Sequence, residues 1–221
     1  MLVAIRDEAA AFAQVLAGLS APDWDRPTRC DPWRVRDVVG HVITVLARVP
    51  AMVAAPPPER ADTTATSYYR ADQRFSEEAN ADRVLTARRR AAAGEVGALA
   101  DDLAATARTV IAAGRQAPEG RIVRTRHGDA ILLEDFLTTR VVELAVHGLD
   151  VADALGRPPW LTAAAAQCLQ RLLFGPGWQT AVATLGWPPE TLLRRTTGRG
   201  PVTVDESAAL AELGLRPLTV G

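Results

Sequence analysis

Glu143 and His147 lie four residues apart, and a carboxylate and an imidazole at this spacing could bind a metal ion. At 3.6 residues per turn, the spacing stacks the two side chains on one face of a helix, so both can reach a single point. Arg140 and Asp150 lie one turn before and after the pair, where they could orient it. Solvated surface pairs show the same spacing, so spacing alone leaves both interpretations open.

The stretch 132–156 that carries this pair has the pattern of one long helix with a buried face. Its apolar residues recur at steps of three and four, which is typical of an amphipathic helix. They are Leu133, Phe136, Leu137, Val141, Leu144, Ala145, Leu149 and Ala152. Asp129 is the expected N-cap and Gly156 the expected C-terminal cap.

A second helix is expected over residues 34–49, with valines along its buried side and His41 near its middle. If the two helices are neighbours in a bundle, His41, Glu143 and His147 form a set of two imidazoles and one carboxylate. Three protein ligands leave a coordination position open, as in catalytic zinc sites, and iron or nickel would also suit this set. The alternative is a buried His41 satisfied by hydrogen bonds, and periodicity does not exclude it.

The remaining chain must position these two helices, and its pattern predicts an all-α protein or nearly so. No alternating strand pattern is evident. Before residue 132, the other expected elements are a helix over 2–19, a loop over 54–67, a short helix over 68–79, a long helix over 83–113 weakened at Gly94 and Gly97, and a turn-rich connection over 114–130. After residue 160, shorter helical pieces are expected at 162–174, 179–185, 190–195 and 206–213.

Composition limits the binding partners and the cellular compartment that we expect for this protein. The 221 residues carry a net charge of -1, so no positive excess indicates nucleic acid or an anionic membrane as a partner. The triplet of residues 88–90 is basic, but acids follow it, which favours a solvated helix face. Cys30 and Cys168 match no metal or redox spacing, and no signal-peptide core or membrane-length apolar run is evident. We therefore expect a cytoplasmic protein with reduced thiols.

Two segments resemble the signatures of a known family. PTRCDPWRVRDVVGHV, residues 27–42, is similar to the N-terminal signature of the mycothiol-dependent maleylpyruvate isomerase family, within the DinB-like metal-binding bundle superfamily. TRVVELAVHGLDVADALG, residues 139–156, is similar to that family's second signature, and TTGRGP, residues 196–201, resembles a recurrent C-terminal element. The resemblance implies a DinB-like four-helix bundle over 1–160 and a small, mostly helical C-terminal appendage over 161–221 packed on the bundle.

Carried over residue by residue, the resemblance implies that a divalent metal binds His41, Glu143 and His147. Two positions depart from the first signature. Arg34 stands where a Thr or Ser usually caps the helix, and Pro32 stands in place of the usual Gly. Neither departure changes a ligand.

The resemblance also implies a function, namely a thiol enzyme of the isomerase or S-transferase type. Zinc is the favoured metal, with nickel and iron as alternatives, and mycothiol is the implied cosubstrate for addition to a small electrophile. Arg195 and Arg199 are candidates for pairing with carboxylates, although exposed structural arginines are an equal alternative. His127, Tyr68 and Tyr69 could border the pocket, but loop or packing roles are favoured. The alternative function is a non-catalytic metal-binding or regulatory bundle, and either protein is expected to be a monomer or homodimer.

Overall fold

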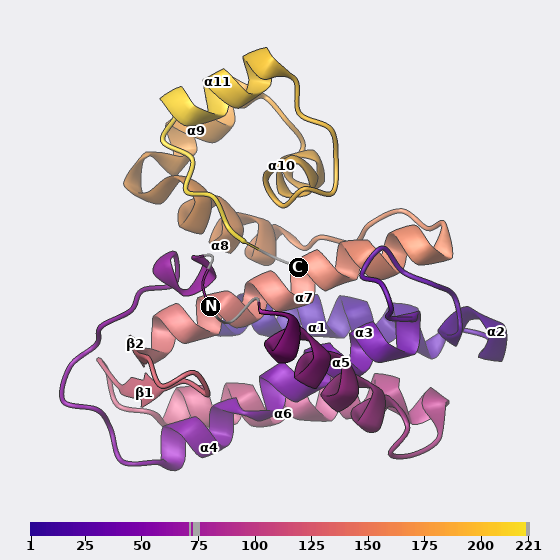
Figure 1. The fold of residues 1–221 in the computed structure, drawn as a ribbon. Coiled ribbons are helices and arrows are strands. Elements are labelled where there is room, and N and C mark those ends of the chain that lie inside the picture. The colour runs from indigo at the N-terminus through magenta and orange to yellow at the C-terminus, as the bar shows by residue number, and fades with distance from the viewer. Residues whose placement is uncertain (71, 73–75, 220–221) are drawn as a thin grey trace.

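The main body of the protein is a bundle of four long helices. The structure, a computed structural model, describes residues 1–70, 72 and 76–219. The four helices are α1 (Leu2–Ala17), α3 (Val35–Ala47), α6 (Leu99–Gln116) and α7 (Leu133–Leu155). Helices α1 and α3 each pack against both α6 and α7 (Figure 1). The predicted helical fold with a four-helix bundle is confirmed.

Helix α7 runs through the centre of the molecule and matches the helix predicted over 132–156. Its apolar positions are buried, and Leu144 and Leu149 are almost inaccessible to solvent. The helix ends at Gly156, whose φ of 65° is the left-handed conformation that glycine adopts without steric cost. Because α7 contacts the bundle on one side and the C-terminal helices on the other, it is buried around most of its circumference.

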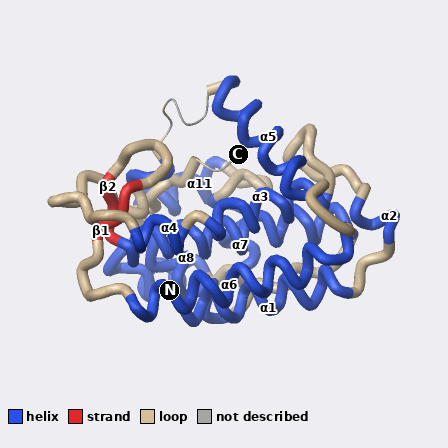
Figure 2. Tube along the Cα trace, turned by 90° about the horizontal axis from the view of Figure 1, so that it is seen from below, coloured by secondary structure: helices blue, strands red, loops and turns tan. Residues whose placement is uncertain are grey.

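A short antiparallel hairpin precedes α7 where only a turn-rich connection was expected. It consists of β1 (Ile122–Arg124) and β2 (Ala130–Leu132), and it lies at one end of the bundle (Figure 2). Three-residue strands show too little alternation to be recognised in the sequence. In the turn, Asp129 accepts a hydrogen bond from Thr125 Oγ1 at 3.1 Å. The prediction that Asp129 caps α7 was therefore wrong, and Leu132 occupies that position.

The single helix predicted over 83–113 was also wrong, because the structure has two helices there. Helix α5 (Glu77–Ala91) ends before a turn and the 3-10 helix η3 (Val96–Ala98), and α6 begins at Leu99. Gly94 and Gly97 both lie in this break. Helix α5 crosses α3 at Gly40, where an added Cβ would lie 2.6 Å from the backbone oxygen of Ala87. The chain must therefore turn between packing on α3 and entering the bundle as α6.

Shorter elements connect the long helices. They are α2 (Ala21–Trp24), α4 (Val49–Ala54) and the 3-10 helix η1 (Ser67–Tyr69). The helix predicted over 68–79 is replaced by η1 and the start of α5, while residues 71 and 73–75 lie outside the described residues. The stretch Val35–Ala54 is long and apolar enough to cross a membrane, yet 56% of its most apolar window is buried here. Its apolarity is accounted for by its place in the core.

The C-terminal segment folds into helices that pack on α1 and α7. They are α8 (Ala163–Phe174), η4 (Gly175–Gly177), α9 (Trp178–Leu185), α10 (Pro189–Thr196) and α11 (Val204–Glu212), which lie together on one side of the bundle (Figure 1). Leu169, Leu173 and Leu193 belong to the same buried cluster as the core of the bundle. The division of the chain at residue 160 stays a prediction, since one core runs through both parts.

Candidate metal centre

His41 and Glu143 meet at the contact between α3 and α7. Both residues lie on faces that pack together, and His41 Nε2 is 3.1 Å from Glu143 Oε2. The imidazole of His41 is buried, and the indole of Trp33 lies over it with ring centroids 4.8 Å apart. Packing of α3 on α7 therefore brings together two residues that are 102 positions apart in sequence.

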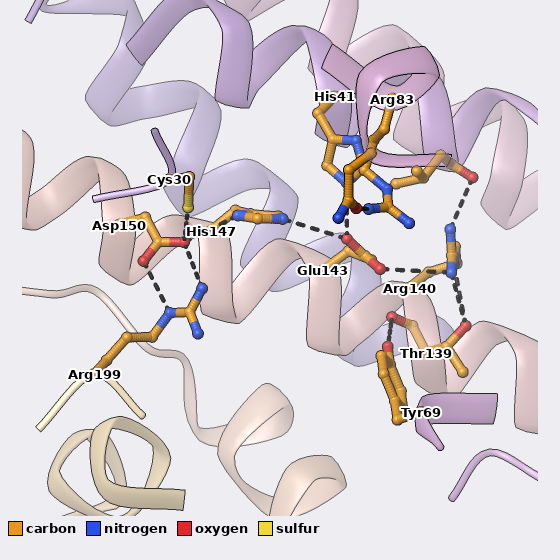
Figure 3. Close-up of polar contacts among 12 residues, drawn as sticks. Cys30, His41, Tyr69, Arg83, Thr139, Arg140, Glu143, His147, Asp150 and Arg199 are labelled. Carbon is orange, nitrogen blue, oxygen red and sulfur yellow. Dashed lines mark hydrogen bonds and ion pairs between the residues drawn. The ribbon is translucent and has the colours of Figure 1, made fainter. Parts of the chain in front are cut away.

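His147 completes the set one helical turn after Glu143. Its Nε2 is 3.5 Å from the same Glu143 oxygen, and one ligand atom from each of His41, Glu143 and His147 lies within 4.8 Å of the other two (Figure 3). Around a tetrahedral ion with bonds near 2.1 Å, neighbouring ligand atoms are about 3.4 Å apart. The separations between the nitrogens and the Glu143 oxygen fit such an ion, as does the donor chemistry.

Burial and the neighbouring polar groups shift the pKa of each of these three side chains in opposite directions. Burial lowers the pKa of His41 to about 4, although the Glu143 carboxylate opposes this shift. Burial alone would raise the pKa of Glu143, but hydrogen bonds from His147 and His41 outweigh it and hold the pKa well below its usual range. The pKa of His147 is raised, because Asp150, Cys30 and Glu143 outweigh the effect of burial. A cation arriving here meets a charged carboxylate and displaces a proton from His147.

Asp150 holds the other ring nitrogen of His147. Its Oδ2 is 3.0 Å from His147 Nδ1, and both of its oxygens accept hydrogen bonds from Arg199 at 2.8 and 2.9 Å. Cys30 Sγ also donates to Asp150 Oδ2 at 3.2 Å. Cys30, His147 and Asp150 could themselves hold a cation, but the guanidinium of Arg199 already neutralises the carboxylate. Asp150 is therefore better suited to orienting His147 than to binding metal.

Arg140 supports the opposite side of the Glu143 carboxylate. One of its terminal nitrogens is 3.8 Å from Glu143 Oε1, and the guanidinium also donates to Thr139 Oγ1 and to the backbone oxygen of Val45. The ring of Phe136 lies 4.5 Å from the guanidinium carbon. With these contacts, the buried Arg140 is fixed in place and stabilises a charged Glu143.

A cavity of about 280 Å³ opens beside the three candidate ligands. His41, Glu143 and His147 all line it, together with Tyr68, Tyr69 and His127, the residues expected to border the pocket. The hydroxyl of Tyr69 donates to the backbone oxygen of Thr139 at 3.0 Å, which ties this wall to α7. The volume is close to the lower end of the range for small-molecule sites, about 300–1,000 Å³.

Arg195 and Arg199, the two predicted arginines, lie outside the group of residues that line this cavity. Arg195 pairs with Glu206 and lies over the ring of Trp187, 4.3 Å from its centroid. Arg199 is buried against Asp150 and so contacts a partner of His147. A direct role of either arginine in catalysis stays a prediction, and the geometry gives Arg199 a positioning role.

Several lining residues were missed in the sequence. Trp33 was noted only as part of a signature, and Cys30 only there and as a cysteine without metal or redox spacing. Arg48, Arg83 and Arg126 were not singled out for the site. The arginines come from the end of α3, from α5 and from the hairpin turn, so no sequence spacing connects them. Only the packing of these three elements reveals the group.

A helical bundle in which two imidazoles and a carboxylate converge at a cavity defines a class, the helical-bundle proteins with a candidate metal site. Residues 5–152 match the family model described as the mycothiol maleylpyruvate isomerase N-terminal domain. The chain belongs to this family, as its two signatures predicted.

Two solved structures are similar to this one. A crystal structure of the mycothiol-dependent maleylpyruvate isomerase superposes with a TM-score of 0.58 at 13% identity, covering 90% of this chain and 88% of that chain. A histidine-to-alanine mutant of that isomerase gives a TM-score of 0.53 at 14% identity, covering 76% of this chain and 66% of that chain. At these identities the likeness concerns the fold alone. A comparison with curated protein sequences found no match.

Proposed function

We propose that the protein is a divalent-metal-dependent thiol enzyme of the isomerase or S-transferase type. The observation that carries the proposal is the convergence of His41, Glu143 and His147 at a small-molecule cavity in a member of this family. Zinc suits the donor set, and nickel or iron is compatible with it. The similar solved enzyme is mycothiol-dependent, so we propose mycothiol or a related low-molecular-weight thiol as the cosubstrate.

Neighbouring side chains hold the three proposed metal ligands in place before a metal or substrate binds. A divalent metal at the three donors supplies the positive charge that favours the thiolate form of a thiol at neutral pH. Asp150 fixes the ring of His147, Arg140 fixes Glu143, and Trp33 packs against His41. Donors held in this way need little reorganisation, which is the usual requirement for an efficient site.

The proposed reaction begins when a thiolate sulfur forms a bond to an electrophilic carbon of the second substrate. If that carbon belongs to a double bond conjugated with a carbonyl group, the π electron pair moves to the carbonyl oxygen. After rotation about the former double bond, the electron pair returns from the oxygen, the new C–S bond breaks, and the products are the geometric isomer and the original thiolate. Protonation of the adduct instead gives a thioether, which is S-transfer.

Metal content tests the centre directly. Protein purified without added metal and without a His tag should contain nearly one equivalent of a divalent metal by elemental mass spectrometry. His41→Ala should lose it, because two donors hold a divalent ion weakly. His127→Ala is the matched control and should retain the metal, since His127 is the one histidine outside the ligand set. Metal-free wild type that also fails to take up zinc would contradict the proposal.

Turnover separates the enzyme from a non-catalytic metal-binding bundle. The metal-loaded protein should accelerate consumption of maleylpyruvate or another small electrophile only when mycothiol is present, as followed by absorbance. His41→Ala should abolish the thiol-dependent rate. Stoichiometric metal without thiol-dependent turnover across a panel of thiols and electrophiles would favour the non-catalytic alternative.

A further inference from the structure

The wall of the cavity carries more positive than negative charge. Among the described residues, its lining includes four arginines, Arg48, Arg83, Arg126 and Arg140, against two carboxylates, Asp31 and Glu143. Arg140 is committed to Glu143, Thr139 and Val45. A metal at the candidate centre would add further positive charge, so the cavity favours an anionic occupant.

Arg48 is the most informative of these residues. Its guanidinium is half-buried, yet it forms no ion pair with a carboxylate anywhere in the described part of the chain. Burial, together with the neighbouring guanidiniums of Arg126 and Arg140, lowers the pKa of Arg48 from its ordinary value. Arg126 has an acidic partner in Asp82 at 3.6 Å, but 61% of the Asp82 side chain is exposed to solvent. Cations gathered in this way are stabilised when an anion binds between them.

Arg48 and His147 lie toward different ends of one cavity. Arg48 follows His41 by seven residues, which is two helical turns or about 10 Å along the axis. On α7, Arg140 precedes His147 by the same number of residues, and Arg140 contacts Val45 near the end of α3. The two helices therefore run antiparallel through the site, so the end of α3 that carries Arg48 lies toward Arg140 and away from His147.

We propose that Arg48, Arg126 and Arg83 form a subsite for an oxyanion group of the electrophilic substrate, either a carboxylate or a phosphate. This inference rests on the proposed function for the identity of the occupant. The electrophilic carbon then lies near His147 and Glu143, and the anionic group extends toward the end of α3. Guanidinium groups pair with two oxygens of a carboxylate or phosphate through two parallel hydrogen bonds.

Binding of simple anions tests the subsite without any thiol or turnover. Titration calorimetry at low ionic strength would compare succinate, inorganic phosphate and neutral succinamide, using the full chain as purified and again after chelation and dialysis. Succinate or phosphate should bind both forms, because arginines rather than the metal hold the anion, and succinamide should not bind. The tighter of the two anions identifies the group as carboxylate or phosphate.

Charge-matched variants locate the binding. Arg48→Gln and Arg126→Gln should each weaken the preferred anion about tenfold or more, since each removes a charged hydrogen-bond donor. Arg89→Gln, on the exposed face of α5 and away from the cavity lining, makes the same change in net charge and should leave affinity unchanged. Circular dichroism would verify that every variant is folded.

Three results would overturn the subsite: no anion binding by the wild type, binding lost on chelation, or affinity unchanged in both cavity variants. These results are distinct from failure of the proposed function. That function depends on metal content and thiol-dependent turnover, and neither is measured in the anion titrations.

Discussion

His147 uses its two ring nitrogens for two separate tasks. Nε2 faces Glu143 at the cavity, whereas Nδ1 is held by Asp150, which lies outside the cavity lining. A fixed partner at Nδ1 sets the ring orientation and leaves the Nε2 lone pair of the neutral ring for a metal. A residue outside the cavity lining thereby orients one of the three candidate donors.

Asp150→Asn should weaken metal binding by roughly 10- to 100-fold, the usual effect of removing such a partner. Competition with a chromogenic chelator would measure the change. Asp153→Asn is a close control, because Asp153 also lies on α7 and forms a similar two-bond pair with Arg194 of α10, but its side chain is 40% exposed. Its metal affinity should stay within about twofold of wild type, as expected for an exposed pair. A folded Asp150→Asn protein that binds metal as tightly as the wild type would refute the positioning role of Asp150.

At the scale of elements, the contact between α3 and α5 shapes the cavity. Helix α5 supplies Arg83 and Val84 to the lining, and its approach to α3 depends on Gly40 having no side chain. The neighbouring atoms are the backbone oxygen of Ala87 and the backbone nitrogen of Ala91, which cannot rotate away. The position of this wall is therefore set by one glycine on the facing helix.

Gly40→Ala should lower the free energy of unfolding by about 1–3 kcal/mol, because α5 must shift to admit the methyl group. Urea unfolding followed by circular dichroism would measure it. Gly97→Ala provides the control, since nothing lies within 4 Å of a Cβ at that position. This second variant should be neutral or slightly stabilising, by about 0.4–1 kcal/mol. Similar stabilities for the two variants would show that α5 is not tightly seated.

The sequence predicted the elements whose hydrophobic periodicity extends over many consecutive residues of one segment. Helix α7, and with it the pairing of Glu143 with His147, follows from periodicity over more than six turns. The addition of His41 needed the family resemblance, since periodicity cannot show which helices are neighbours. The break between α5 and α6 and the hairpin before α7 were missed, because tertiary packing overrides weak local preferences there. The arginine group depends on three elements meeting, so no single segment encodes it.

At the scale of the whole molecule, a buried carboxylate joins the first helix to the C-terminal segment. Glu8 on α1 accepts hydrogen bonds from the backbone nitrogen and Oγ1 of Thr162, at 2.9 and 2.7 Å, where α8 begins. Burial raises the pKa of Glu8 above its ordinary value, although the Thr162 bonds oppose the shift. The folded state therefore holds this proton more tightly than the unfolded state does.

The contribution of Glu8 to stability should thus decrease as pH rises from its ordinary pKa of 4.5 through the raised value in the folded state. Glu8→Gln keeps an acceptor for Thr162 without the charge. The unfolding temperature of this variant relative to wild type should increase between about pH 4 and pH 7. Calorimetric scans at both pH values would measure it, with Glu119→Gln in an exposed loop as control. If the difference in unfolding temperature between Glu8→Gln and wild type did not change with pH, the raised pKa of Glu8 would be contradicted.

The pair formed by Asp150 and Arg199 links the candidate metal centre to the C-terminal segment. The family match ends at residue 152, so the donors lie inside it and Arg199 lies beyond it. Free-energy coupling is reciprocal: whatever affinity the docked C-terminal segment gives to a metal at His147, the bound metal returns as tighter docking of that segment. The segment after residue 152 would thereby act as an intramolecular clasp on a metal bound at the candidate centre, and releasing the clasp would favour loss of that metal.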